Sequence, residues 1–366
     1  MRDPLRPNEE LLTGFGGLPV VEFPSWDGLR QDMDGAMARP ERGPGFLEEQ
    51  RRLLDALAAP QSAAWRVRMR RPEVELMRTP LGSRYVEPDP IEDVEDYLDR
   101  FFARVPPAEI HALIVGNLPT ADRTAMAADR ALAAIAARAV SLGGLRSLFF
   151  GEILREELEL SWIGLGDLGS VVAALPGLRD LTLRGASLGC GLRVPRHENL
   201  EELTVQSAAL PVRLVDDLCA SDLPALRRLE LWTGVEEYRG VVAANDLDGL
   251  LSGDAFPALR HLGLRNAEKP DIWIASLARS PLVARLEVLD LSLGALTDSG
   301  GLALVRHADA FAHLKRLDLH HHFLGEKVCE RLRAALPGVD IDLSEPRDPK
   351  VLDWSDRVHY YTVIAE

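Results

Sequence analysis

The sequence contains little of several features that would assign a protein to a class at once. Only three of its 366 residues are cysteine (Cys190, Cys219 and Cys329), so it has no disulfide framework, and we expect a reducing cytoplasm. No run of about 18 apolar residues occurs, which excludes a membrane-spanning helix. The first ten residues also lack the apolar core of a signal peptide. The 42 basic residues are outnumbered by 57 acidic ones, and a net charge of −15 argues against a nucleic-acid-binding protein.

What the sequence does contain is an internal repeat. Six copies of the pattern Leu-x-x-Leu-x-Leu begin at Leu178, Leu200, Leu226, Leu259, Leu286 and Leu314. Looser copies begin at Ile110 and Leu145, and another begins at Leu336. Within each copy the last two leucines flank a polar residue, as in a half-buried strand. One repeat cannot bury its leucines alone, whereas stacked neighbours can.

The segments between these copies predict helices. Successive starts from Leu178 are 22, 26, 33, 27, 28 and 22 residues apart. Residues 212–219, 272–278 and 328–336 carry apolar side chains at helical spacing. The sequence therefore predicts an α/β leucine-rich-repeat solenoid of eight or nine repeats, with a parallel sheet on the concave side and helices on the convex side.

The ninth position of the repeat refines this prediction. Where many leucine-rich repeats carry asparagine, this chain has mostly small residues: Ala186, Ala208, Gly234, Ala267, Gly294 and, in the last copy, His322. With spacings near 26–28, the pattern resembles the ribonuclease-inhibitor-like class, which implies a full helix in each repeat.

A narrower resemblance spans most of the chain. Residues 17–24, 64–68, 221–232 and 317–322 are similar to a small family of uncharacterised bacterial leucine-rich-repeat proteins, as are Gly151-Glu152 and residues 161–163. Members of that family are often encoded near radical-SAM and sulfatase-like proteins, which implies a helper role in a modification pathway. The Gly/Pro/Arg-rich stretch at about 25–60 departs from the family pattern.

The two ends of the chain differ from the repeats. Residues 1–60 are rich in glycine, proline and charge, and we expect them to be variable and partly mobile, with one helix at 46–57. Residues 61–105 are expected to cap the solenoid at 106–345, with a strand around Trp65 and a helix over 91–102. Residues 346–366 form a C-terminal cap or tail, in which 358–364 is expected to pair as a closing strand.

The sequence offers no clear catalytic or metal centre. His320, His321 and His322 are adjacent, but neighbouring side chains of a strand point to opposite faces, so we expect no metal site there. No G-x-S-x-G elbow or phosphate-binding loop occurs. Cys190 follows a glycine in a loop and is the cysteine expected to be accessible. We expect no catalytic residue and no cofactor.

The concave face remains as the candidate site. The residues expected to project from it are Arg184, Arg228, Glu230, Trp232, Arg265, Asp290, Asp318 and His320, with Glu236 and Tyr238 at the rim. Trp232 is the expected anchor, because tryptophan and arginine are enriched at interface hot spots. We therefore predict a non-catalytic scaffold that binds a partner protein, without nucleic acid or membrane.

Two other functions stay open at this stage. An enzymatic or accessory role would need a pocket near the N-terminal cap, around Glu152, Glu156 and Trp162, with a carboxyl group of perturbed pKa. A structural role would make the chain a subunit that assembles through the ends of the stack.

Overall fold

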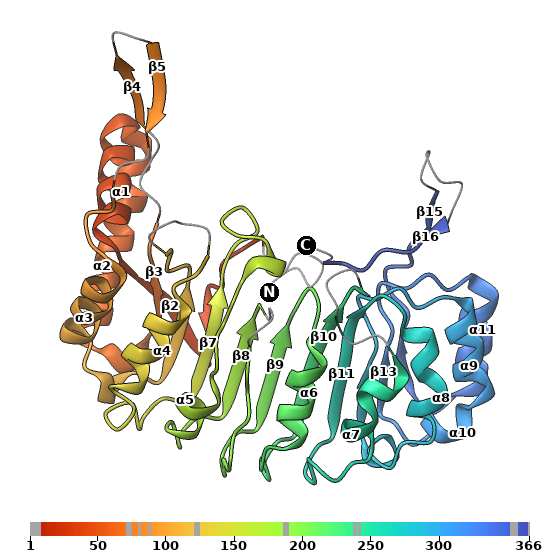
Figure 1. Cartoon of the computed structure of the whole chain (residues 1–366). Helices are drawn as coiled ribbons and strands as arrows, with labels where there is room; N and C mark the ends of the chain where they lie inside the picture. Colours follow the sequence, from red (N-terminus) through yellow and green to blue (C-terminus); the bar gives the residue numbers. More distant parts are fainter. Residues whose placement is uncertain are drawn as a thin grey trace.

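The computed structural model describes residues 9–70, 75–79, 82–86, 89–120, 125–185, 190–236, 240, 243–351 and 358–364. Over these residues the chain forms one curved, open row of strands with helices along one face (Figure 1). The repeat pattern and the solenoid predicted from it are confirmed.

The main sheet has 12 strands within the described residues, all parallel except the first. Their order follows the chain: β1 Gly14–Phe15, β2 Leu18–Pro24, β3 Ala64–Arg68, β6 Ala112–Gly116, β7 Ser147–Glu152, β8 Asp180–Arg184, β9 Glu202–Gln206, β10 Arg228–Gly234, β11 His261–Ala267, β12 Val288–Asp290, β13 Arg316–Asp318 and β14 Asp340–Asp342. All nine copies of the repeat coincide with strands, β6 to β14. Two antiparallel pairs lie outside this sheet, β4 Glu75–Thr79 with β5 Gly82–Val86 and β15 Lys350–Val351 with β16 Val358–His359.

The core follows directly from the repeat. One position of each main-sheet strand from β3 to β14 is in register through the sheet, and its side chains are buried in all but the last strand: Trp65, Leu113, Leu148, Leu181, Leu203, Leu229, Leu262, Leu289, Leu317 and the half-buried Ile341. Each fully buried leucine stabilises the fold by about 1.5–3 kcal/mol. A continuous apolar ladder of this kind explains why the repeats stack instead of folding separately.

The helices are less regular than the strands. They are α1 Trp26–Ala38, α2 Gly43–Ala58, α3 Val94–Arg104, α4 Ala128–Ala136, α5 Gly169–Ala173, α6 Val212–Cys219, α7 Asp248–Leu251, α8 Ile274–Leu277, α9 Asp298–Arg306, α10 Ala308–Phe311 and α11 Glu326–Ala335. The helices expected at 46–57, 91–102, 212–219 and 328–336 are present. Only four residues of the stretch at 272–278 form α-helix, in α8.

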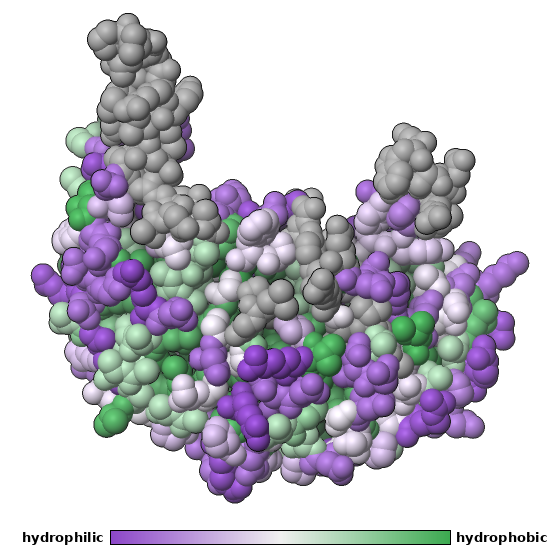
Figure 2. Space-filling view, viewed as in Figure 1, coloured by the Kyte–Doolittle hydropathy of each residue, from purple (hydrophilic) through white to green (hydrophobic). Residues whose placement is uncertain are grey.

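A full helix in every repeat, as the ribonuclease-inhibitor-like class implies, is not observed. Both α7 and α8 have only four residues, and no helix occurs in the described part of the segment between β8 and β9. Repeat length alone does not account for this, since α7 lies in the longest repeat, where Leu226 and Leu259 are 33 residues apart. The hydropathy view of the same side shows hydrophilic residues gathered at the lower loops and a paler apolar surface over α4 and α5 (Figure 2).

The N-terminal 60 residues are more structured than their composition suggests. Strand β2 pairs in parallel with β3, so β3 is an interior strand of the sheet and not part of a separate cap. Phe23 of β2 is buried against Tyr97 and Phe101 of α3, with ring centroids 6.0 and 5.3 Å apart. These apolar contacts extend the solenoid core to β2, in a region where sequence composition alone predicted a variable, partly mobile segment.

The C-terminal segment does not extend the main sheet. Strand β16 pairs with β15, and residues 363–364 cross the ends of β11 and β12 instead. The side-chain amide of Asn266 donates to the carbonyl of Ile364 (2.7 Å) and accepts from its N–H (3.0 Å). The N–H of Val363 donates to the carbonyl of Leu293 (3.0 Å). The tail is thereby attached to the repeats through its backbone.

Candidate functional site

The side chains of the concave face form three rows across the strands. Residues in register lie side by side, so each row can be followed from strand to strand. The first row is Asp180, Glu202, Arg228, His261, Val288, Arg316 and Asp340. The second is Phe149, Thr182, Thr204, Glu230, Gly263, Asp290, Asp318 and Asp342. The third begins with Arg184 and Gln206 on β8 and β9 and continues with Trp232 and Arg265 on β10 and β11.

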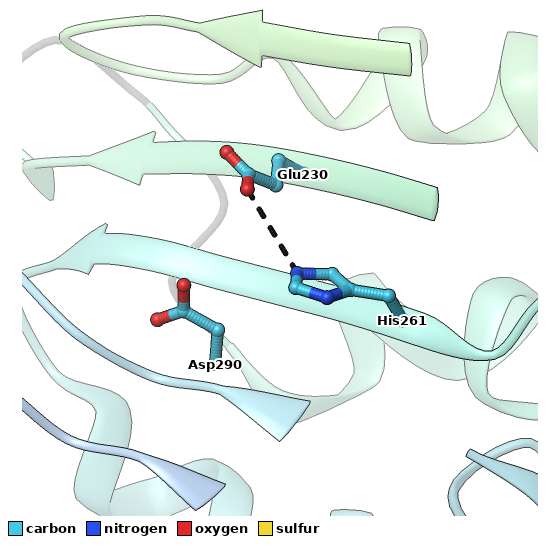
Figure 3. Close-up of side chains that lie close together, drawn as sticks. All are labelled: Glu230, His261 and Asp290. Atoms are coloured by element: carbon cyan, nitrogen blue, oxygen red, sulfur yellow. Dashed lines mark ion pairs between the residues drawn. The ribbon is translucent and has the colours of Figure 1, made fainter. Parts of the chain in front are cut away.

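Arg265 is the centre of an ion-pair network in these rows. Its Nη1 lies 3.2 Å from Glu230 Oε2 and its Nε lies 3.2 Å from Asp290 Oδ2. Glu230 also pairs with Arg228, and its Oε1 lies 3.8 Å from Nε2 of His261. Figure 3 shows Glu230 and His261 pointing toward each other from adjacent strands, with Asp290 on the next strand. Both carboxylates are only 5% exposed, so Arg265 is their main source of charge compensation.

Gly263 makes room for this network. It lies in the second row between Glu230 and Asp290, and a Cβ atom there would lie 3.0 Å from Glu230 Cγ and 3.4 Å from Arg265 Cδ. The missing side chain lets Glu230 and the stem of Arg265 approach each other over the sheet.

The environment sets the charge of each group in the network. Burial disfavours ionisation of Glu230, but Arg265, Arg228 and His261 outweigh it and lower the pKa of that carboxyl. Burial raises the pKa of Asp290 despite Arg265. Burial lowers the pKa of His261 to about 4, and the positive charge of Arg228 is the next largest cause of this shift. The imidazole is therefore neutral at neutral pH. The positive charges of the network therefore come from its arginines.

A second cluster lies at the C-terminal end of the sheet. Arg316 Nη2 lies 3.0 Å from Asp318 Oδ2 and 2.6 Å from Asp342 Oδ2. His320 Nδ1 lies 2.6 Å from Asp318 Oδ1. The aspartates also have a local role: Oδ1 of Asp290, Asp318 and Asp342 each accepts the N–H of the residue two positions later. The Leu-Asp-Leu-Ser and Leu-Asp-Leu-His sequences thus end their strands in the same side-chain turn.

The Asp318–His320 pair predicts a pH-dependent stability. Burial opposes the imidazolium, but the hydrogen bond and charge of Asp318 raise the pKa of His320. Despite its own burial, Asp318 has its pKa lowered to about 2 by His320 and Arg316. The Asp318–His320 pair therefore stabilises the folded state fully between about pH 4 and pH 6.5. Its contribution declines as the pH rises through the folded-state pKa of His320.

We expect His320→Gln to lower the free energy of unfolding by about 1 kcal/mol more near pH 6 than near pH 9. Urea denaturation of wild type and variant at the two pH values measures this difference. His111→Gln, at an exposed position before β6, is the control and should show no such difference. An equal loss for His320→Gln at both pH values would contradict the assignment.

Neither cluster needs a metal ion for charge balance. The ligand atoms of Glu230, His261 and Asp290 lie within 4.8 Å of one another, as do those of Asp318, His320 and Asp342. These are the residues that could hold an ion, but in both clusters an arginine already pairs with the carboxylates.

The three adjacent histidines do not converge. His320 faces Asp318, while His322 is buried, with Nε2 near the carbonyl of Leu343 (3.2 Å) and Nδ1 accepting the N–H of Leu324 (3.0 Å). His321 is also buried, with a φ of 60°, and burial followed by Arg347 lowers its pKa to about 4. His322 occupies the ninth repeat position, as the sequence pattern indicated, and the structure adds that its ring bonds to the backbone there.

A groove borders the rows toward the N-terminal end. Its volume is about 670 Å³, and one wall is the segment from Leu12 to Pro19. Its floor consists of Phe149, Thr182, Thr204, Gln206, Arg228 and Glu230. The wall is attached at two points: the phenyl rings of Phe15 and Phe149 are 6.2 Å apart, and the N–H of Leu12 donates to Glu152 Oε1 (2.7 Å). The N-terminal segment thus gives one side of the open sheet a wall.

The predicted site residues fall into two groups. Arg184, Glu230, Trp232 and Asp290 are buried (1–5% exposed). The side chains of Arg265, Asp318 and His320 are 12–14% exposed, and that of Arg228 is 40% exposed. Trp232 is 2% exposed, with the guanidinium of Arg265 5.3 Å from its ring, so it is not a surface anchor. Glu236 is exposed and pairs with Lys269, and Tyr238 lies outside the described residues.

The three residues around which an enzymatic pocket was expected lie in different environments. Glu152 is fully buried and pairs with Arg66, whereas Glu156 and Trp162 are exposed. Cys190 is also buried, and burial raises the pKa of its thiol to about 12, so the accessibility expected for it is wrong. Sequence reasoning missed the groove wall at 12–19, because nothing in a local pattern indicates which strands a terminal segment will cover.

Comparison with known proteins supports the fold only. No protein-family profile and no curated protein sequence matches the chain. A crystal structure of a Bacteroides fragilis protein is similar, with 29% identity, a TM-score of 0.64, and coverage of 69% of this chain and 70% of that one. A leucine-rich-repeat protein of Leptospira interrogans is 17% identical over 65% of this chain and 62% of that one, but its TM-score is 0.29, too low to support a conclusion. Among the described helices, none is long and apolar enough to span a bilayer.

Proposed function

We propose that this protein binds a polypeptide partner, without catalysis, in the groove of its concave face. The observation that carries the proposal is the groove itself: about 670 Å³, bounded on one side by residues 12–19, with half-buried polar side chains on three consecutive strands. Strands about 4.8 Å apart give a floor long enough for several residues of an extended chain. The buried ion pairs of Arg265 hold the neighbouring side chains in fixed positions, which lowers the entropic cost of binding.

The charges at the border of the groove, in the first row of the concave face, indicate which charges the partner carries. Asp180 and Glu202 are adjacent on β8 and β9, and Arg228 follows on β10. Burial and the nearby Glu202 raise the pKa of Asp180 to about 6, a sign that this acidic pair lacks sufficient positive charge. A basic residue of the partner over Asp180 and Glu202, with an acidic residue over Arg228, would complete the pattern.

Site-specific photo-crosslinking tests the proposal in the cells that produce the protein. A photo-reactive residue at Thr204, on the groove floor, is expected to capture one defined polypeptide. The same residue at Arg196, an exposed position outside the groove, should not. Capture from Arg196 alone, or from neither site, would contradict binding in the groove.

Charge reversal then tests the chemistry with the captured partner. Arg228→Glu and Glu202→Lys are each expected to weaken binding about five- to tenfold, since both charges lie at the surface and moderate salt sensitivity follows. Arg196→Glu is the matched control and should leave the affinity unchanged. If Arg228→Glu and Glu202→Lys both bind the partner as tightly as wild type, the interface does not lie at this part of the concave face.

A further inference from the structure

A second cavity lies at the N-terminal end of the sheet, apart from the groove. Its volume is about 310 Å³, within the range of small-molecule sites. Strand β2 contributes Glu22, strand β3 contributes Arg66 and Arg68, and Arg70 follows β3 by two residues. Helices α1 and α2 contribute Asp32, Glu49, Leu53 and Arg52, and Arg52 pairs with Glu48 outside the cavity. Arg66, Arg68 and Arg70 alternate along β3 and the two residues after it with Trp65, Val67 and Met69, which are buried. They therefore share the face of the sheet opposite the core.

Each arginine has an acidic partner of its own. Arg66 Nε lies 2.7 Å from Oε2 of the buried Glu152, and Arg68 Nη2 lies 2.9 Å from Glu157 Oε1. Arg70 pairs with Asp32 across the cavity. These contacts hold the three guanidinium groups in place without using Glu22.

Glu22 is the fourth carboxylate, and it sits among the three arginines at longer range. The nearest nitrogen of Arg66 is 3.9 Å from it, that of Arg68 3.8 Å and that of Arg70 3.7 Å. None of these distances is a hydrogen bond. The side chain is only 20% exposed and lines the cavity. Burial raises the pKa of Glu22 against the opposing effect of the arginines, as expected for an acid short of hydrogen-bond donors.

The mixture of charges restricts the ligand. A simple anion would be repelled by Glu22, Asp32 and Glu49, and a metal ion by the guanidinium nitrogens within 4 Å of Glu22. A molecule that carries both charges is compatible with both the acidic and the basic side chains of the cavity. Its ammonium group can donate to Glu22 while its carboxylate accepts from the arginines. Leu53, together with Leu11 and Val20, offers apolar surface for an aliphatic portion.

We propose that this cavity binds a small zwitterion of the α-amino-acid type, with Glu22 accepting from its ammonium group and Arg68 and Arg70 donating to its carboxylate. The cavity shares no lining residue with the groove assigned to polypeptide binding, so either proposal can be wrong without affecting the other.

Titration calorimetry of the full chain with each common L-amino acid tests the proposal. At least one is expected to bind at millimolar concentration or below. Its N-acetyl derivative, which has no ammonium group, and its carboxamide, which has no carboxylate, should each bind about tenfold more weakly or worse. Absence of binding by every amino acid would overturn the proposal, and so would equal binding of the N-acetyl derivative, which would indicate an anion site.

Two variants assign the binding to this cavity. Glu22→Gln is expected to weaken zwitterion binding about tenfold, while Glu330→Gln, at an exposed position on α11 far from the cavity, should leave it unchanged. Leu53→Trp removes no charge and should weaken binding by filling the cavity, so it replaces Glu22→Gln if that variant does not fold. Unchanged binding in the folded variants would place the ligand elsewhere and overturn the assignment.

Discussion

Replacing Arg265 by methionine is expected to lower the free energy of unfolding by about 3–5 kcal/mol near pH 7. The substitution keeps much of the side-chain volume but leaves Glu230 and Asp290 buried without their shared cation. An uncompensated buried charge is the costly part of a broken ion pair, and here the two carboxylates lie on β10 and β12, the strands on either side of β11. Denaturant unfolding of wild type and variant measures the loss.

The pH dependence of Arg265→Met gives a second readout. Without Arg265 both carboxyl groups are expected to have folded-state pKa values above those of the unfolded chain. The variant should therefore gain stability relative to wild type as pH falls from about 7 toward 4, because protonation removes the buried charges. Arg228→Met is the control: its side chain is 40% exposed, and we expect a loss of about 1 kcal/mol or less. Equal losses in the two variants would contradict the central role of Arg265.

Glu152→Gln is expected to lower the free energy of unfolding by about 3 kcal/mol and to loosen the wall of the groove. Glu152 is fully buried, pairs with Arg66 (6% exposed), and accepts the N–H of Leu12. Arg66 in turn donates to the carbonyl of Leu12 (2.6 Å). Loss of the charge leaves Arg66 without its hydrogen-bonded carboxylate and weakens the attachment of the N-terminal segment.

Hydrogen exchange separates the local effect from the global one. Amides of residues 11–20 should exchange faster in Glu152→Gln, by more than the change in global stability accounts for. Glu156→Gln, four residues away in an exposed turn, should change stability by less than about 0.5 kcal/mol and leave the exchange unaltered. If residues 11–20 keep their protection in Glu152→Gln, the clamp on Leu12 is not what holds the wall.

Much of the fold was predictable because the repeat is a local pattern with a single packing solution. The leucines at alternate positions of each copy are buried in register, and the helices over 212–219 and 328–336 formed where the apolar spacing indicated. Prediction was weaker where composition was used in place of pattern. Residues 18–24 lie in a glycine- and proline-rich region, yet Phe23 of that segment packs into the aromatic core of α3.

The site was predicted only in part, for a physical reason. Alternation along a strand correctly places Arg228, Glu230 and Trp232 on the concave face, but it does not say which of them is covered. Burial of Trp232 depends on Arg265 of the next strand, and burial of Glu230 on Arg228 and Arg265 together. Partners that lie on different strands are separated by whole repeats in the sequence, and their distances appear only after the strands are stacked.

The sequence by itself determined the solenoid, the strand positions and the face on which each polar residue lies, because these depend on periodicities within about ten residues. The tertiary structure decided what those residues do. It brought Leu12 to Glu152, 140 positions away, and so gave the groove a wall. It also placed Glu22 among Arg66, Arg68 and Arg70, because the register of two parallel strands sets distances that no local spacing contains.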